Sequence, residues 1–346
     1  MKKILSLLAL SSLLSFKAQA APVNLSLIGT ASTDSLFESQ LPTNLCIGFI
    51  HCGSQTLKGL AVSYGSNTVR DSADGALLAI GLNVVEGDSR GLQFSFITNI
   101  NAGRFAGLQT SFYNVNAGEE FAGMQLGFLG NYNGGRAAGA QLSVFSNVQT
   151  NTMSGLQFSL ANVLAAGAKE DEKVSDFAVQ LGLVNVSTQE NVISIGLINV
   201  IKGGRLGLSL DTGMFHYNRL TFVSGSKYLY SILQLDDHVL NPDKKNDYHP
   251  NRIGVIGFGL GLAIPLSEKF AVRYEYCRYS PTSYERDSGS LWRLLGEYKA
   301  NRFVALHAGL ERFRFEDNYF SAQLSNHRDN YALTAGVSFN IMGVSL

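Results

Sequence analysis

The chain has 346 residues, no net formal charge, 16% charged residues, 36 glycines and 6 prolines. Soluble proteins usually have about a quarter of their residues charged and about 7% glycine, so this chain is poor in charge and rich in glycine. No run of eighteen apolar residues follows the N-terminal segment, which excludes spanning helices. Together with 21 Phe and 14 Tyr, this composition favours β structure that can face lipid.

The first twenty residues resemble an export signal. Lys2 and Lys3 precede an apolar stretch, 4–16, and small residues follow at Ala18 and Ala20. This pattern predicts a secretory signal peptide over 1–20 that is cleaved near Ala20. Cleavage removes three lysines and no acidic residue, which leaves 24 basic and 27 acidic residues and a formal charge of −3. That balance gives nucleic-acid binding no support.

The three cysteines are too few for a disulfide framework. Cys46 and Cys52 are close enough to close a small loop in an oxidising compartment, or they stay as two idle thiols. A zinc site needs more ligands at close spacing, and His51 alone does not supply them. The sequence therefore predicts no metal and no cofactor.

A sixteen-residue repeat dominates the middle of the chain. A fixed period of this length indicates a unit that stacks on or pairs with its neighbours. Glycine recurs at the same place in seven units: Gly59, Gly75, Gly91, Gly107, Gly123, Gly139 and Gly155. Glutamine follows two residues later in the last five: Gln93, Gln109, Gln125, Gln141 and Gln157.

Each unit alternates apolar residues with small or polar ones. Residues 91–96 read Gly-Leu-Gln-Phe-Ser-Phe, which is the period of a strand with one apolar face. Residues 101–104 read Asn-Ala-Gly-Arg, and Asn and Gly tolerate the positive φ of tight turns. One unit therefore predicts a strand of about twelve residues and a turn of about four.

Two architectures fit this unit. A strand of about twelve residues, tilted by about 40°, spans roughly 30 Å and matches a bilayer in an up-and-down barrel. In a solenoid, the unit is one coil, and equivalent residues stack into Gln and Asn ladders. Adjacent apolar residues at Phe96 and Ile97 weaken the barrel interpretation. The asparagine column shifts by one residue at Asn114 and Asn162, which weakens the solenoid interpretation.

The later chain favours the barrel. The repeat returns at 180–186 and 194–200 with a period of fourteen, and an even change preserves strand alternation. Residues 256–264 and 331–341 alternate large apolar with small or polar residues, as transmembrane β-strands do. We predict an all-β fold: an antiparallel up-and-down transmembrane β-barrel of about 16–18 strands.

In this prediction, residues 21–346 form a single barrel domain. Its repeat-built strands cover 58–201 and its non-repeat strands cover 203–346. The five glutamines of the repeats point into the lumen, where they line a polar wall or simply bond to one another.

Six charged or titratable residues are also predicted to face the lumen, because their neighbours on the same strands are apolar. Charged residues on membrane strands are tolerated when they face the interior and pair. They either select polar solutes or fill the interior with salt bridges. The six residues are Arg273, Glu275, Arg293, Glu297, His307 and Glu311.

The repeats resemble a known group of sequences. Residues 179–186 read Val-Gln-Leu-Gly-Leu-Val-Asn-Val, and 257–262 read Gly-Phe-Gly-Leu-Gly-Leu. Over roughly 59–276 the chain is similar to uncharacterised bacterial surface-repeat proteins with Gly-Leu-Gln-x-Gly-Leu-x-Asn repeats. The resemblance implies an outer-membrane or surface location and no established activity. The C-terminal strands separately resemble outer-membrane barrels.

These observations predict an outer-membrane or cell-surface β-barrel protein that acts as a passive pore with a Gly/Ser/Gln-lined interior. Its partners would be outer-membrane lipid and small polar solutes. The alternative is a surface β-solenoid for adhesion or interaction with a barrel-like C-terminal anchor. A hydrolase is third, because the loop 235–251 carries several Asp and His residues without a catalytic motif. We therefore expect no enzyme.

Overall fold

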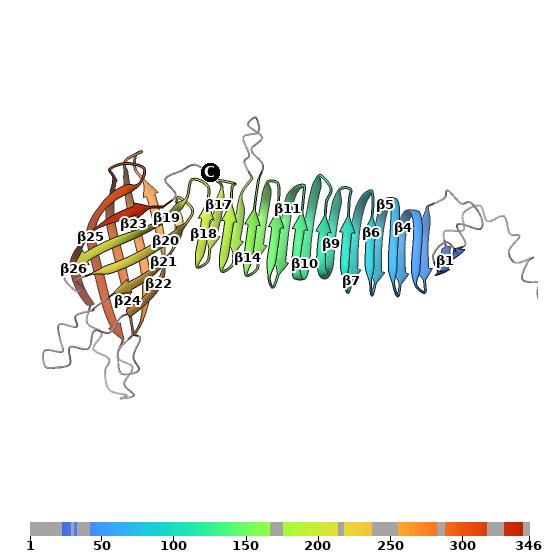
Figure 1. Ribbon diagram of the computed structural model, residues 1–346, viewed down its shortest axis with the longest axis horizontal. Helices are drawn as coiled ribbons and strands as arrows, with labels where there is room; N and C mark the ends of the chain where they lie inside the picture. Colours follow the sequence, from blue (N-terminus) through green and yellow to red (C-terminus); the bar gives the residue numbers. More distant parts are fainter. Residues whose placement is uncertain are drawn as a thin grey trace, which may run out of the picture. The chain divides into compact units, whose positions relative to one another are not determined.

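The computed structural model describes residues 23–28, 31–32, 42–166, 176–213, 218–236, 255–281, 288–316 and 329–341. This part of the chain is all β (Figure 1). Strands β1 to β18 build a β-solenoid whose ladders are parallel except for the antiparallel pair β1 and β2, and β19 to β26 build a closed antiparallel barrel. None of the described residues forms a helix that is long and apolar enough to span a membrane. The chain divides into two compact units, Met1–Phe128 and Leu129–Leu346.

The first unit consists of solenoid strands. They are β1 (Val23–Ile28), β2 (Ala31–Ser32), β3 (Thr43–Gly48), β4 (His51–Ser63), β5 (Ser66–Ala79), β6 (Leu82–Val85), β7 (Asp88–Ser95), β8 (Thr98–Asn101) and β9 (Phe105–Asn116). Strand β10 (Glu120–Asn133) begins in this unit and ends in the next.

The second unit holds further solenoid strands and the whole barrel. The solenoid strands are β11 (Arg136–Ser143), β12 (Ser146–Gln149), β13 (Met153–Phe158), β14 (Ala161–Leu164), β15 (Ala178–Leu181), β16 (Val184–Ser187), β17 (Val192–Ile195) and β18 (Ile198–Ile201). The barrel strands are β19 (Arg205–Gly213), β20 (Arg219–Gly225), β21 (Leu229–Asp236), β22 (Val255–Pro265), β23 (Phe270–Pro281), β24 (Ser288–Lys299), β25 (Val304–Glu316) and β26 (Asp329–Asn340).

The glycine column is a line of very close contact between coils of the first unit. Gly59 pairs with Gly75, and Gly75 pairs with Gly91, in parallel ladders. Gly75 has a φ of 141°, and a Cβ there would lie 1.9 Å from the carbonyl oxygen of Gly59. Any side chain would therefore strain the backbone and push the coils apart. The sixteen-residue glycine is a requirement of coil stacking.

Buried amide ladders run through the interior beside this column. Gln109 Nε2 donates to Gln93 Oε1 at 2.8 Å, and Asn83 Nδ2 donates to Asn99 Oδ1 at 2.8 Å. The four side chains have no exposed surface. Each amide satisfies a neighbour one coil away, so a buried polar group costs little in this interior.

The first coils have an apolar interior instead. Leu77 lies in register with Gln93, so it occupies the glutamine position of its own coil. It belongs to a buried cluster with Leu57, Val69 and a disulfide between Cys46 and Cys52. The repeats therefore change from hydrophobic packing to amide ladders along the first unit.

The ladders continue across the change of period in the second unit. Gln180 Nε2 donates to Gln157 Oε1 at 2.8 Å although the two residues are 23 apart. Asn185 Nδ2 donates to Asn199 Oδ1 at 2.7 Å with a separation of fourteen. Strand pairing therefore depends on equivalent positions in the coils rather than on a constant period.

The predicted barrel strands over 58–201 are wrong: the described residues of this range form the parallel solenoid. Both irregularities that weakened the solenoid interpretation fall at coil corners. β7 pairs with β9 at an offset of sixteen, whereas β8 pairs with β9 at fifteen, so the missing residue lies between the paired segments. The corners themselves hydrogen-bond from coil to coil, as Phe112 N does to Phe96 O. The one-residue change is taken up where the corner meets the next strand, so the ladders on both sides keep their register.

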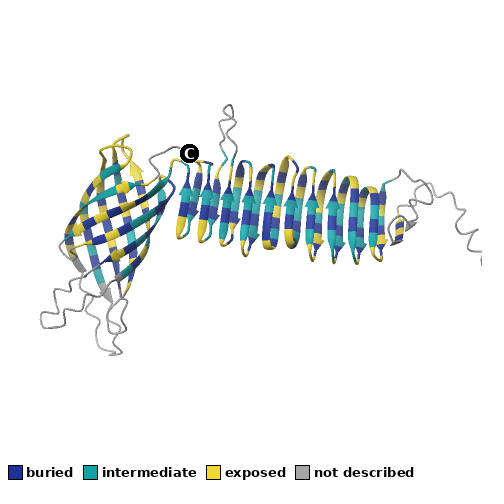
Figure 2. Ribbon diagram, viewed as in Figure 1, coloured by how far each residue is buried: buried dark blue, intermediate teal, exposed yellow. Residues whose placement is uncertain are grey.

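The predicted count of 16–18 barrel strands is also wrong, because the closed barrel has eight, β19 to β26. Buried and exposed residues alternate along its strands (Figure 2). On β24, Arg293 is 1% exposed and its neighbour Leu294 is 52% exposed. Arg278 of β23 is also exposed on the outer face. Every strand nevertheless carries large apolar residues there, among them Leu210, Leu220, Leu235, Phe258, Leu262, Tyr274, Trp292, Leu294, Leu306, Leu310, Tyr331 and Leu333.

Candidate functional site: the interior and mouth of the barrel

Glycines on β22 make room for large side chains inside the barrel. A Cβ at Gly261 would lie 2.3 Å from the ring of Tyr230, and one at Gly257 would lie 2.9 Å from the ring of Tyr279. Both tyrosines are buried. The Gly-x-Gly-x-Gly pattern of β22 therefore allows bulky residues from β21 and β23 to fill the interior.

Arg293 lies at the centre of a buried charge network. Its guanidinium is 3.2 Å from Asp211 Oδ1 of β19 and 3.1 Å from Glu275 Oε2 of β23. All three side chains have no exposed surface. A charge this deeply buried is stable only with such partners. The network therefore joins strands on different sides of the barrel.

Arg219 of β20 makes the second set of ion pairs. Its Nε lies 2.9 Å from Asp236 Oδ1, and its Nη1 lies 3.0 Å from Glu311 Oε2. Near it, the Tyr279 hydroxyl donates to the side-chain oxygen of Gln234. Arg219 and Glu311 are 92 residues apart in sequence, so this contact exists only in the closed barrel.

Arg273 and Arg205 form the third set, toward the end of the barrel where β19 begins. Arg273 Nη1 lies 3.0 Å from Glu297 Oε2, and its Nε donates to the Tyr230 hydroxyl at 3.0 Å. Arg205 reaches the same Glu297 with two bonds of 2.9 and 3.0 Å. Arg273 also contacts Glu275, which connects this set to Arg293. Two arginines therefore share the one carboxylate of Glu297.

His307 connects Ser338 and Asp211. Ser338 Oγ lies 3.1 Å from Nδ1 of His307, and Nε2 of the ring contacts Asp211. The residue types are those of a hydrolase triad, but acyl transfer also needs donors aimed at an oxyanion. Strand β26 pairs with β19 and with β25, so the backbone amides beside Ser338 are engaged in the sheet. The geometry supports a structural contact better than a nucleophile.

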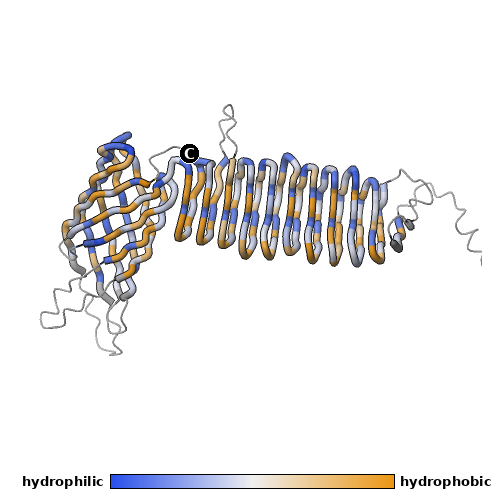
Figure 3. Tube along the Cα trace, viewed as in Figure 1, coloured by the Kyte–Doolittle hydropathy of each residue, from blue (hydrophilic) through white to orange (hydrophobic). Residues whose placement is uncertain are grey.

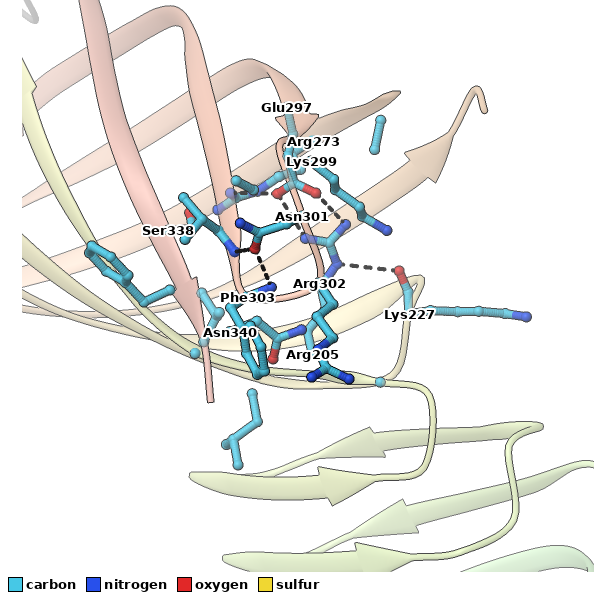
Figure 4. A pocket seen from close by; sticks show the side chains of 18 of the residues that line it. Arg205, Lys227, Arg273, Glu297, Lys299, Asn301, Arg302, Phe303, Ser338 and Asn340 are labelled. Carbon is cyan, nitrogen blue, oxygen red and sulfur yellow. Dashed lines mark hydrogen bonds and ion pairs between the residues drawn. The ribbon is translucent and has the colours of Figure 1, made fainter. Parts of the chain in front are cut away.

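A pocket of about 330 Å³ opens at the mouth of the barrel. Figure 4 shows its polar side chains gathered around the turns at this end. Its charged lining residues are five cations and one carboxylate, Arg205, Lys227, Arg273, Lys299, Arg302 and Glu297. Because Glu297 is already bonded to two arginines, the excess charge is positive. Chemically, this mouth suits an anionic group.

The structure places the six charged residues predicted from the sequence together inside the barrel. All are at most 3% exposed. The sequence did not identify their partners Asp211, Arg219 and Asp236. These partners alternate with exposed Leu210, Leu220 and Leu235, so the same strand alternation could have revealed them.

The other predicted sites lie elsewhere. Gln93, Gln109, Gln125, Gln141 and Gln157 lie inside the solenoid and not in a barrel lumen. Residues 1–20 and most of the loop 235–251, over 237–251, lie outside the described residues. Within the described ranges, no group of three or more His, Cys, Asp and Glu residues is placed to hold a metal ion.

No family model matches this chain, and no curated protein matches it.

Proposed function

We propose that the protein is an outer-membrane protein of a double-membraned bacterium in which the barrel anchors a β-solenoid that serves as an interaction module. The observation that carries this proposal is the inverted polarity of the barrel. Arg219, Arg273 and Arg293 are its largest fully buried side chains, whereas leucines and aromatic residues cover its outer face. A water-soluble barrel has the opposite arrangement.

The dimensions agree with a bilayer anchor. Strands β22 to β26 have 11 to 13 residues. At about 3.3 Å per residue and a tilt of about 40°, these strands rise roughly 30 Å along the barrel axis. Such a wall in water would expose a large contiguous apolar surface, which lipid would cover. The predicted signal peptide agrees with export to the envelope.

The filled interior supports an anchor rather than a passive pore. Eight strands enclose a space just wide enough for side chains. Here the three buried arginines, their carboxylates and two tyrosines occupy it. Salt-bridge filling is therefore the better interpretation of the charged residues, and solute passage gains no support from the geometry.

Connection lengths favour the periplasmic side for the solenoid. Bacterial barrels have short periplasmic turns and longer extracellular loops. Residues 226–228, 266–269 and 300–303 join strands at one end. The connections at the other end are 214–218, 237–254, 282–287 and 317–328, and each is longer than any of these three. The solenoid joins β19 at Arg205, which pairs with Gly225 beside the first short turn. Under this proposal, the solenoid presents its stacked coils within the envelope.

The only tryptophan of the chain tests the membrane anchor. Trp292 lies on the outer face of β24 and is 36% exposed. We expect lipids with brominated acyl chains to quench its fluorescence in the full-length protein refolded into vesicles. We also expect a heat-dependent shift in gel migration, as for other folded outer-membrane barrels. An unquenched Trp292 without a heat shift would show that the barrel does not enter the bilayer.

Protease treatment of cells tests on which side of the outer membrane the solenoid lies. The solenoid should resist protease added to intact cells and should be cleaved when the outer membrane is permeabilised. Cleavage on intact cells would place the solenoid at the cell surface instead, and would leave the membrane anchor itself unaffected.

A further inference from the structure

One corner of the solenoid is apolar in the coils of the second unit. It consists of one or two large apolar residues at the turn between the two strands of each coil. Successive corners stack, since Leu160 N donates to Val144 O at 3.0 Å and Leu197 N donates to Leu183 O at 3.0 Å. The exposed residues of this corner are Val144, Phe145, Leu160, Leu183, Val184, Leu197 and Ile198, each 37–55% exposed. We call them the apolar edge.

The first unit has the same edge with more aromatic residues. Phe112 N donates to Phe96 O at 3.3 Å, so these corners also stack. Phe96 is 70% exposed and Tyr64 is 66% exposed, which are high values for rings of this size. The residues of the edge in this unit are Phe49, Ile50, Tyr64, Ile80, Phe96, Ile97, Phe112, Tyr113 and Phe128. Every coil therefore places large apolar side chains at this corner.

The opposite corner of the coils is polar. In the first unit it carries the exposed ion pair Arg104–Glu120, and in the second it carries Lys202–Glu190. Figure 3 shows the contrast along the coils, with hydrophilic residues at one corner and hydrophobic residues at the other. The outer surface of the solenoid is therefore amphipathic about its own axis.

Within the second unit, the apolar edge ends against the outer wall of the barrel. Ser231 of β21 points outward, because its neighbours Tyr230 and Ile232 are buried inside. Ser231 Oγ accepts from Gly196 N at 3.4 Å and from Asn199 Nδ2 at 3.2 Å. Ser224 of β20 is the ladder partner of Ser231. Its hydroxyl donates to Leu197 O at 3.2 Å. The last corner of the solenoid thus contacts the wall that lipid would cover.

The contact fixes the depth of the edge relative to that wall. The pair Ser224 and Ser231 lies one step from Gly225 and Tyr230, the last pair before the short turn 226–228. Farther from this turn on the same outward face come Leu220 and Leu235, which are 38% and 46% exposed. The apolar edge therefore begins at the border of the apolar wall, at the height of a bilayer interface.

We propose that the apolar edge of the solenoid lies in the interface of the phospholipid bilayer that holds the barrel. This inference rests on the proposed membrane anchor. Aromatic and branched apolar side chains partition into the interface, and an amphipathic element with a polar opposite face lies in its plane. Under this proposal, lipid covers the barrel wall beside Leu197 and Ile198, so the bilayer is a partner that lies next to the apolar edge. The coils of the second unit then lie along the membrane with their polar corner facing water.

Matched tryptophan variants of the full-length protein test this contact. In a Trp292→Phe background, Phe145→Trp reports on the apolar edge and Thr150→Trp reports on the opposite corner, since the two positions flank strand β12. Phe112→Trp and Ala117→Trp are the corresponding pair in the first unit. The proteins are reconstituted into phosphatidylcholine vesicles whose acyl chains are brominated close to the headgroup. We expect quenching of at least about twofold at the edge positions and almost none at the control positions.

Other outcomes would overturn the inference. Equal quenching at positions 145 and 150, or none at either, would show that the edge does not select the bilayer. A blue-shifted but unquenched Phe145→Trp signal would mean that protein, such as a second copy, covers the edge. Quenching of native Trp292 with no quenching at position 145 would reject the edge contact and leave the barrel anchor intact. An unquenched Trp292 would reject the proposed function itself.

Discussion

The solenoid and the barrel both bury polar side chains, but they satisfy them at very different sequence separations. In the solenoid, Gln109 bonds to Gln93, one coil away. In the barrel, Arg219 bonds to Glu311 across 92 residues. The solenoid uses neutral amides in near-neighbour rungs, whereas the barrel uses full charges that meet only on closure. Polar interiors can therefore be built from local or from long-range contacts. We expect the two regions to lose stability in different ways when these contacts are removed.

The stability of a repeat stack is approximately the sum of the coil stabilities and of the contacts between neighbouring coils. A destabilising substitution should therefore affect only the coils near it. A closed barrel has no such independence, because each strand completes the hydrogen bonding of both neighbours. Four substitutions or treatments test this difference.

The largest effect is expected in the barrel. Arg293→Met would leave Asp211 and Glu275 buried with one fewer cation and lower the free energy of unfolding by about 3–5 kcal/mol. Urea titration of the folded, heat-shiftable form in lipid measures this change. Arg302→Met, at the exposed rim, is the control and should change stability little. Equal stability of the two variants would contradict the role assigned to the network.

Next is the glycine column. Gly107→Ala combines a φ of 147° with a Cβ 1.9 Å from Gly91 O, so we expect a loss of about 3 kcal/mol in the first unit. Hydrogen exchange should show faster exchange in β7 and β9 and unchanged exchange in the barrel. Gly296→Ala is the matched barrel control, since its Cβ would meet only Ala308 O at 3.8 Å. Faster exchange throughout the barrel in Gly107→Ala would argue against local failure.

Loss of a single rung of the amide ladder should lower the free energy of unfolding by less than Gly107→Ala does. Gln109→Met keeps the volume but leaves Gln93 Oε1 and Gln125 Nε2 without the Gln109 amide. An orphaned buried polar group costs about 1–3 kcal/mol. The shift in the urea midpoint of the first unit measures the cost, and Thr110→Val on the neighbouring outward position is the control. An unchanged midpoint would mean that the ladder does not contribute to stability.

The disulfide is expected to contribute no more than one rung of the ladder. Cys46 and Cys52 close a loop with a separation of only six residues, so reduction should cost roughly 2 kcal/mol. The change should appear as faster hydrogen exchange in β3 and β4 alone. Cys277→Ser with the disulfide intact is the control for thiol loss. Exchange that rises as far as β9 on reduction would show longer-range coupling along the coils.

Strand identity could be predicted from the sequence for both regions, but the partners of the strands could not. The alternation in 256–264 and 331–341 indicates barrel strands with an apolar outer face, and the structure has β22 and β26 there. In the repeats, the shift at Asn114 suggested that stacking was imperfect. Only the pairing of β8 with β9 shows that the shift lies in a corner.

Only part of the charged cluster could be predicted from the sequence, for a similar reason. Glu275 and Arg293 lie on neighbouring strands, and strand order makes them adjacent. Asp211 and Arg219 lie on β19 and β20, which meet the C-terminal strands only when the barrel closes through β26. Sequence spacing contains no information about that closure.

The sequence alone determined the period of the coils, the recurrence of glycine at each sixteenth position and the two faces of the barrel strands. Each of these follows from local stereochemistry and from the two-residue period of a strand. The tertiary structure alone decided that the repeats stack in parallel, that eight strands close the barrel and that one corner of every coil is apolar. These features depend on which distant backbones meet, and a parallel coil and an antiparallel wall strand present nearly the same alternation along the chain.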